Sequence, residues 1–369
     1  MKEREDKEHH YATTISRLTQ LVIFLLALVV ILIIALVHYA PNYVPNKKTI
    51  EIEPDSNGNF TLEAKQKMLE ASLDIVDYWI APEISALEKN ANKNLILYGK
   101  DLIEHTANYY GENGSIFKSS TNGMNCQNCH LEAGTKIFGN NYSAVASTYP
   151  KYRARSGSIE TISKRINDCF ERSLNGKAID TSSKEMKAIT AYISWLGKGV
   201  PKSEKPAGSG LRDLPFLDRA ADPNNGKLVY EQKCKSCHQT NGEGLMNADK
   251  TAYTYPPLWG KKSYNTGAGL YRLSTFAKFA KCNMPQNATY DHTQLTDEEA
   301  WDVAAFVNSQ YHPVKDTKAD WPKIEEKPVD HPFGPYQDSF DEKQHKYGPF
   351  KPIQKKIMAL KDSKKATKE

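Results

Sequence analysis

The sequence predicts an all-α protein made of two consecutive domains of one kind, with an N-terminal transmembrane helix and an irregular C-terminal segment that wraps over the domains. Three observations lead to this prediction. The pattern Cys-x-x-Cys-His occurs twice, at 126–130 and at 234–238. Apolar residues recur at helical spacing, and strand-like alternation is rare. An unbroken apolar run covers residues 21–37, which is just long enough to cross a bilayer.

Each Cys-x-x-Cys-His motif contains the residues that covalent haem attachment requires. Two thiols one helical turn apart reach the two vinyl groups of one porphyrin, and the next histidine supplies an axial nitrogen to iron. A zinc site is the alternative, but no second thiol pair stands near either motif. We therefore predict two covalently bound haem c groups in two tandem cytochrome c domains. The predicted haem-binding residues are Cys126, Cys129 and His130 in the first domain and Cys234, Cys237 and His238 in the second.

Composition shifts and helix signals divide the chain into seven parts. In order, these are a cytoplasmic N-terminus (1–20), the transmembrane anchor (21–38), a connector with a helical extension (39–90), the first cytochrome c domain (91–205), a linker (206–222), the second cytochrome c domain (223–312) and the wrapping tail (313–369).

Each domain is expected to contain a leading helix before its haem motif and a closing helix after it. The predicted helices are 62–80, 95–110, 158–173 and 226–232, and two that start at the capping boxes Ser182-x-x-Glu185 and Thr296-x-x-Glu299. The repeated order of helix, motif, loop and helix indicates an internal duplication.

Charges around the apolar run predict its orientation. Basic residues precede it, and only Lys47 and Lys48 closely follow it, so the N-terminus should stay in the cytoplasm of a bacterial cell. The domains would then lie in the periplasm, tethered to the inner membrane. A cleaved signal peptide is the alternative, but a cut after Ala40 would place His38 at the −3 position, where a small residue is preferred.

The net charge of +5 comes largely from the lysine-rich residues 351–369, which we expect to be a solvated end. No basic stripe interleaved with aromatic residues is present, so nucleic acid is excluded as a partner.

The second iron needs an axial ligand opposite His238. Met284 lies in a loop-forming Asn-Met-Pro sequence that can bring its thioether over the open haem face. His292 and Cys282 are alternatives. A His/Met haem has a relatively high potential and suits electron exit.

The first domain has no further histidine between His130 and the linker, so the other ligand of its iron must be of a different kind. Cys169, Met186 and a lysine are the local candidates. Arg165, Arg172 and Ser173 share a helix face with Cys169, and guanidinium groups nearby favour a thiolate. Two other interpretations of Cys169 stay open, a buried free thiol and a disulfide with Cys282.

Three stretches of the first domain together resemble dihaem thiosulfate dehydrogenases, a family that includes tetrathionate reductases. They are Asn125-Cys-Gln-Asn-Cys-His130, Tyr149-Pro-Lys-Tyr-Arg-Ala-Arg155 and Arg165-Ile-Asn-Asp-Cys-Phe-Glu-Arg-Ser173. The resemblance covers roughly residues 90–350. It implies that His130 and Cys169 are the axial ligands of the active-site haem and that Met284 is a ligand of the second. It also implies that Arg155, Arg165 and Ser173 bind substrate.

The resemblance implies an oxidoreductase that couples two thiosulfates into tetrathionate, or the reverse, with two electrons passing through both haems. A small c-type cytochrome or another periplasmic protein would exchange these electrons. The main alternative is a membrane-tethered dihaem electron carrier without its own substrate. A partner-dependent carrier-protein oxidase with a cysteine-ligated haem is a second, and a dihaem peroxidase is disfavoured because no distal His or Glu motif stands out.

Overall fold

The computed structural model describes Gln20, Leu25 and residues 76–366. Apart from Gln20 and Leu25, the predicted N-terminus (1–20) and transmembrane anchor (21–38) lie outside the described residues. Most of the connector (39–90) lies outside them as well. Of the predicted helix at 62–80, only residues 76–80 are described, and they are not helical. Within the described residues, no helix combines the length and apolar character that crossing a bilayer requires.

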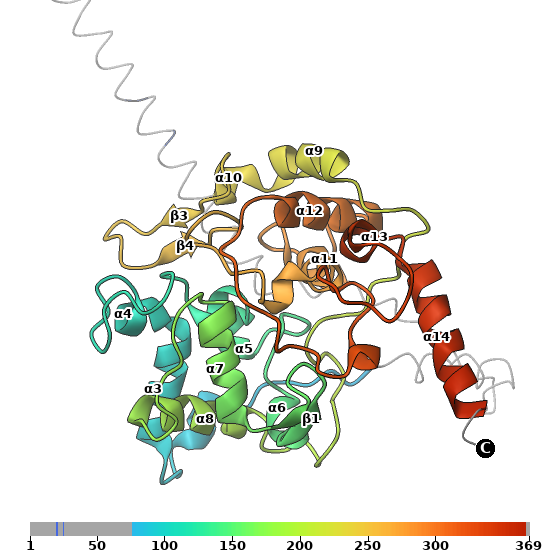
Figure 1. Cartoon of the computed structure of the whole chain (residues 1–369). Helices are drawn as coiled ribbons and strands as arrows, with labels where there is room; N and C mark the ends of the chain where they lie inside the picture. Colours follow the sequence, from blue (N-terminus) through green and yellow to red (C-terminus); the bar gives the residue numbers. More distant parts are fainter. Residues whose placement is uncertain (1–19, 21–24, 26–75, 367–369) are drawn as a thin grey trace, which may run out of the picture. The chain divides into compact units, whose positions relative to one another are not determined.

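The first half of the described chain is a group of helices around the first Cys-x-x-Cys-His motif (Figure 1). Its elements are η2 (Ile84–Leu87), α3 (Lys93–Glu104), α4 (Thr106–Tyr110), η3 (Cys126–Asn128), α5 (Leu131–Gly134), α6 (Val145–Thr148), β1 (Lys151–Arg153), β2 (Ser158–Glu160), α7 (Ile162–Arg172) and α8 (Lys184–Leu196). The single helix predicted at 95–110 is interrupted at His105, which separates α3 from α4.

The leading helix α3 packs against the closing helix α8 at a glycine. A Cβ atom added at Gly99 would lie 2.0 Å from the carbonyl oxygen of Ala188, so only a residue without a side chain permits this approach. The apolar face predicted for α8 is buried at Met186, Ile189, Ile193 and Leu196.

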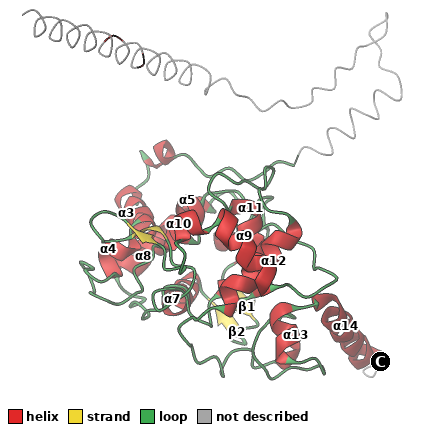
Figure 2. Ribbon diagram, turned by 90° about the horizontal axis from the view of Figure 1, so that it is seen from above, coloured by secondary structure: helices red, strands yellow, loops and turns green. Residues whose placement is uncertain are grey.

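The second half repeats this arrangement. Its elements are α9 (Pro223–Lys233), α10 (Lys235–His238), β3 (Leu245–Met246), β4 (Tyr253–Tyr255), η4 (Gly269–Tyr271), α11 (Leu273–Asn283) and α12 (Asp297–Ser309). Figures 1 and 2 both show α9 beside α12. A Cβ atom at Gly226 of α9 would lie 1.8 Å from the carbonyl oxygen of Asp302 in α12. The same glycine contact in both halves agrees with the predicted internal duplication.

Helix starts differ from the prediction at four places. Helices α3 and α9 begin two and three residues earlier than predicted, at Lys93 and Pro223. Residues 158–160 are the strand β2, which pairs with β1 in an antiparallel hairpin, and α7 begins only after Thr161, whose hydroxyl accepts a hydrogen bond from the Lys164 backbone. The closing helix α8 is capped by Ser183, not by the predicted Ser182. The capping box Thr296-x-x-Glu299 is confirmed at the start of α12.

The tail is less irregular than predicted. It contains η5 (Ile324–Glu326), α13 (Glu342–Tyr347) and a long helix, α14 (Phe350–Ala366). Residues 351–369 were expected to be a solvated end, but Phe350, Ile353 and Ile357 bury one face of α14. This stripe escapes notice in the sequence because lysines surround it. Before η5, the tail descends beside α7 and contacts it, as the Arg172–Asp320 ion pair shows (Figure 1).

Candidate active site and haem-binding sites

His130 of the first motif is held in the orientation that an iron ligand needs. Its Nδ1–H donates a hydrogen bond to the carbonyl oxygen of Asn140 at 2.6 Å, which leaves Nε2 as the nitrogen for a metal. Burial lowers the pKa of His130 to about 4, so its imidazole is neutral, the form that ligates iron.

Cys169 lies on α7 close to both thiols of the first motif. Burial, and in addition the neighbouring Cys169 charge, raises the pKa of Cys126 and of Cys129 to about 12. All six cysteines lie within the described residues and all are free, so the alternative disulfide between Cys169 and Cys282 is not formed. The fold thus places a third sulfur beside the two thiols that attach the first haem.

Five basic side chains of this region divide into two groups. Three of them have carboxylate partners: Arg153 with Glu160 (3.8 Å), Lys164 with Asp168 (2.6 Å) and Arg172 with Asp320 (2.8 Å). Arg155 and Arg165 have no carboxylate within ion-pair distance among the described residues. The two arginines that the resemblance assigns to substrate are therefore the two of these five that have no carboxylate at ion-pair distance among the described residues.

Arg165 and Arg155 differ in what surrounds them. The negative charge of Cys169 is the largest cause that raises the pKa of Arg165, so the two groups are close. Burial, followed by the charges of Arg172 and Arg165, lowers the pKa of Arg155. The guanidinium groups of Arg155 and Arg172 share one acceptor, the carbonyl oxygen of Gly267, at 3.5 and 3.2 Å. A local excess of positive charge therefore lies next to Cys169.

Ser173 caps the C-terminal end of α7, one turn after Cys169. Its carbonyl oxygen accepts a hydrogen bond from the Asn122 side chain. Among the described residues its hydroxyl makes no hydrogen bond, so it is available to a ligand.

Sequence reasoning missed the residues that the tail adds to this site. Asp320 forms two parallel hydrogen bonds with the Arg172 guanidinium, at 2.8 Å each, and the Trp321 ring lies against Arg155. Nearly 150 residues separate Asp320 from Arg172 along the chain, and neither tail residue lies in a motif, so no sequence signal connects them to α7.

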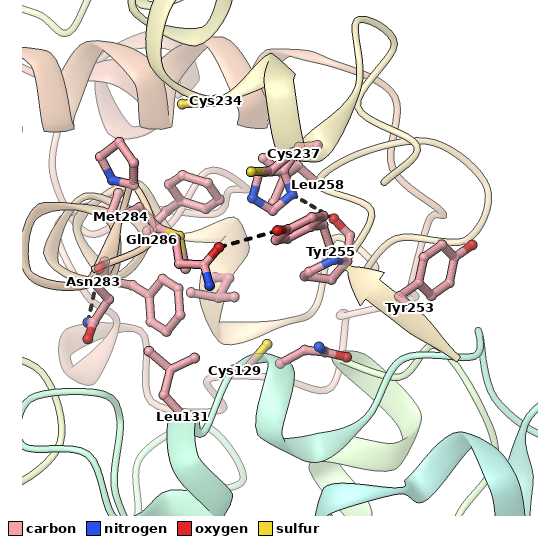
Figure 3. Close-up of a pocket in the computed structure, with 18 of the residues that line it drawn as sticks. Cys129, Leu131, Cys234, Cys237, Tyr253, Tyr255, Leu258, Asn283, Met284 and Gln286 are labelled. Carbon is pink, nitrogen blue, oxygen red and sulfur yellow. Dashed lines mark hydrogen bonds between the residues drawn. The ribbon is translucent and has the colours of Figure 1, made fainter. Parts of the chain in front are cut away.

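The second motif opens into a cavity of about 410 Å³, a volume typical of ligand sites (Figure 3). Cys234, Cys237, His238 and Met284 all line it. His238 Nδ1–H donates to the carbonyl oxygen of Pro256 at 2.8 Å, as His130 does to Asn140. Of the alternatives to Met284, His292 is 73% exposed beside Asp291, and Cys282 is buried within α11, and neither lines the cavity.

Residues of the first motif and of the segment that follows it contact the second haem-binding region. Cys129 and Leu131 of the first domain form part of the wall of the second cavity (Figure 3). Lys136 Nζ donates to the carbonyl oxygen of Ala288 at 3.1 Å, and the Asn283 side chain donates to that of Phe138 at 3.0 Å. Residues 136–140 therefore hold the loop of Met284 and also supply the carbonyl that orients His130.

Both donor sets fit a covalently attached haem. Each has two thiols, a neutral imidazole with Nδ1 tied to a carbonyl, and a sulfur residue nearby for the opposite face. Within the described part of the chain, no group of three or more His, Cys, Asp or Glu side chains is arranged to hold a free metal ion.

Family models match both halves. The SoxA/TsdA cytochrome c domain matches residues 114–201, and the cytochrome c domain matches residues 223–310. The prediction of two cytochrome c domains with two covalently bound haem groups is confirmed.

Several relatives and one solved structure extend the match. Thiosulfate dehydrogenase of Psychrobacter arcticus is 43% identical over 204 residues, which cover 54% of this chain and 60% of that protein. Thiosulfate dehydrogenase of Stutzerimonas stutzeri is 33% identical over 71% of this chain and 80% of that protein. The structure of thiosulfate dehydrogenase (TsdBA) from Marichromatium purpuratum superposes with a TM-score of 0.60 at 28% identity, over 76% of this chain and 57% of that one.

The match thus spans less than two thirds of the Psychrobacter protein and of the Marichromatium chain. It spans four fifths of the Stutzerimonas protein and contains both haem motifs. With the paired family models, this coverage confirms the resemblance found in the sequence: the chain belongs to the thiosulfate dehydrogenase family.

Proposed function

We propose that this protein is an oxidoreductase that joins two thiosulfates into tetrathionate, releases two electrons through its haems, and also catalyses the reverse reduction. One observation carries the proposal. Beside Cys169, Arg155 and Arg165 have no carboxylate partner among the described residues, whereas the three neighbouring cations do. A protein that only carries electrons has no need of guanidinium groups without carboxylate partners beside a cysteine.

The charge of the substrates explains why such groups are needed. Two dianions about 4 Å apart repel each other by roughly 16 kcal/mol at an effective dielectric constant near 20. Fixed cations must offset most of this repulsion. Guanidinium groups suit the task because their fork of N–H donors matches sulfonate oxygens as it matches phosphate. Arg155 and Arg165 supply the charge, and Ser173 supplies a further donor.

Cys169 is the proposed nucleophilic sulfur. Its thiolate and the outer sulfur of one thiosulfate form a sulfur–sulfur bond, which gives a Cys–S–S–sulfonate adduct and releases two electrons. The outer sulfur of a second thiosulfate then attacks the sulfane sulfur of this adduct, which lies between Cys169 Sγ and the sulfonate sulfur, and the bond from Sγ to the sulfane sulfur breaks. Tetrathionate leaves, and the Cys169 thiolate returns. Arg165 stabilises that thiolate as a leaving group, because the two charges lie close together.

The two haems, when bound, supply the one-electron acceptors for the two electrons. His130 and Cys169 would hold the first haem, and His238 and Met284 the second, each haem being attached through its two motif cysteines. A small c-type cytochrome or another periplasmic protein would exchange electrons at the second domain. We further propose that the segment 21–38 anchors the protein in the inner membrane of a bacterium, with both domains in the periplasm.

The test is acceptor reduction by the purified holoprotein with thiosulfate as the only electron donor, followed by tetrathionate reduction on the same sample. Tetrathionate formed at one molecule per two electrons is the expected result. A protein that exchanges electrons with redox dyes but oxidises no thiosulfate would be the electron carrier of the alternative interpretation.

A further inference from the structure

We propose that the C-terminal tail completes the substrate site: the indole N–H of Trp321 donates a hydrogen bond to a sulfonate oxygen of bound thiosulfate or tetrathionate. This inference rests on the proposed function and adds a binding group from outside both cytochrome c domains. Three features of Trp321 and the chemistry of the ligand support it.

First, Trp321 lies directly on Arg155. Its backbone N–H donates to the Arg155 carbonyl oxygen at 2.7 Å, and its ring centroid lies 5.9 Å from the guanidinium carbon. This is the range of a cation–π contact. Because Arg155 has no carboxylate partner among the described residues, an anion that pairs with it lies next to the Trp321 ring.

Second, the Trp321 Nε1–H is buried and has no hydrogen-bond acceptor among the described residues. A buried indole normally finds a partner, as Trp301 does by donating to the carbonyl oxygen of Pro215 at 2.9 Å. A buried donor without an acceptor destabilises the fold. An unpaired donor beside an unpaired guanidinium is explained if one ligand satisfies both.

Third, the backbone of Trp321 is strained. Its φ is +62°, in the left-handed region that bulky side chains rarely adopt. Such strain persists where neighbouring contacts hold it, and it is concentrated at functional sites. Here Asp320 binds Arg172 through two hydrogen bonds on one side of Trp321. On the other side, Pro322 packs so closely on Gly157 that a Cβ there would lie 2.5 Å from the proline ring.

Fourth, the chemistry of the ligand matches these groups. A sulfonate carries three acceptor oxygens and a negative charge, so one end of the substrate can accept from Arg155 and from the indole at the same time. The neighbouring Gly267 carbonyl oxygen accepts hydrogen bonds from both Arg155 and Arg172.

Trp321→Phe tests the inference, because it keeps an aromatic ring on Arg155 and removes only the N–H. Tetrathionate binding to the oxidised holoprotein is measured by calorimetry, so that no turnover occurs. We expect the dissociation constant to rise about ten- to a hundredfold, the effect of one hydrogen bond to a charged group. We also expect an unchanged or slightly higher unfolding midpoint, because an unpaired donor is removed. Trp321→His, which retains a ring N–H, should recover part of the affinity.

Trp301→Phe is the matched control, since it removes an indole N–H that already has a protein acceptor. It should lower the unfolding midpoint and leave tetrathionate affinity unchanged. Equal affinities of Trp321→Phe and the wild type would overturn the inference while leaving the proposed function intact. A wild-type protein that neither binds tetrathionate nor oxidises thiosulfate would instead refute the proposed function, and this inference with it.

Discussion

The two haem-binding regions share one design and differ in what surrounds the sulfur residue that accompanies each haem. Both have a histidine whose Nδ1–H is tied to a carbonyl and a glycine where the leading and closing helices meet. In the first, the sulfur is Cys169, beside guanidinium groups that lack carboxylate partners among the described residues. In the second, it is Met284, in a cavity lined mainly by apolar and neutral side chains. The shared residues therefore fit a covalently bound haem at both sites, and only the first site adds the positive charge that the proposed anion chemistry needs.

Replacing Cys169 by Gly should produce the largest effect. Both haems remain attached, because the motif cysteines are untouched, but thiosulfate oxidation falls by roughly a thousandfold or more. Acceptor-reduction kinetics measure this. Cys282→Ala is the control, since that thiol is buried in α11 outside both sites, and it should keep the rate. If the Cys169→Gly protein oxidised thiosulfate at the wild-type rate, Cys169 would have no catalytic role, and the proposed difference between the two haem-binding regions would be wrong.

Asp320→Asn should have the second largest effect. We expect the free energy of unfolding to fall by about 3 kcal/mol, because the largely buried Arg172 charge loses its partner. Denaturant unfolding of the holoprotein measures this change. Asp218→Asn is a matched control: it also removes an ion pair between the body and the tail, with Lys351, but that pair is exposed and contributes at most about 1 kcal/mol. Equal losses in the two variants would show that the tail is not specifically fixed at the first site.

Arg155→Gln tests whether an arginine without a carboxylate partner binds substrate in the first site. We expect kcat/KM for thiosulfate to fall about ten- to a hundredfold, since a charged hydrogen-bond donor to the substrate is lost. Arg153→Gln removes the same charge from a side chain that already faces Glu160, and should change kcat/KM less than about threefold. If both variants lose activity equally, general attraction of anions explains the cluster better than a specific site.

Lys136→Met should give the smallest effect, a loss of about 1 kcal/mol in the free energy of unfolding, because one hydrogen bond is removed. The lysine fastens the loop of Met284 to the first domain through Ala288, whereas His130 is oriented by a backbone carbonyl that the substitution leaves in place. The reduction potential of the second haem should therefore shift while that of the first stays. Redox titration followed by absorbance measures both, with Lys278→Met, which removes the pair with Asp213, as the control. A shift in the reduction potential of the first haem alone would contradict the role of Lys136 in fastening the loop of Met284.

Local signals predicted much of the fold. The two haem motifs fixed the number of domains, and the Thr296 capping box located the start of α12. The prediction was wrong where tertiary contacts override local pattern. β2 forms because residues 158–160 find a partner in β1, and α14 forms because three apolar residues among lysines dock on the body.

The residues of the candidate site also divide into those that local sequence patterns predicted and those that only long-range contacts bring in. Arg165, Cys169 and Ser173 were predicted together because helical spacing places them on one face of α7. Asp320, Trp321 and Gly267 could not be predicted, because each meets the arginines only through long-range packing. Periodicity and motifs describe neighbours along the chain, and they carry no information about contacts over such separations.

Electron paramagnetic resonance of the oxidised holoprotein shows whether Cys169 ligates the first iron, because it reports the axial ligands of each low-spin haem. A thiolate signature from one haem, absent in Cys169→Gly and retained in Cys282→Ala, is the result that we predict. Spectra in which neither haem has a thiolate ligand, or in which Cys169→Gly leaves the signature in place, would contradict the assignment of Cys169 as the sulfur of the active site.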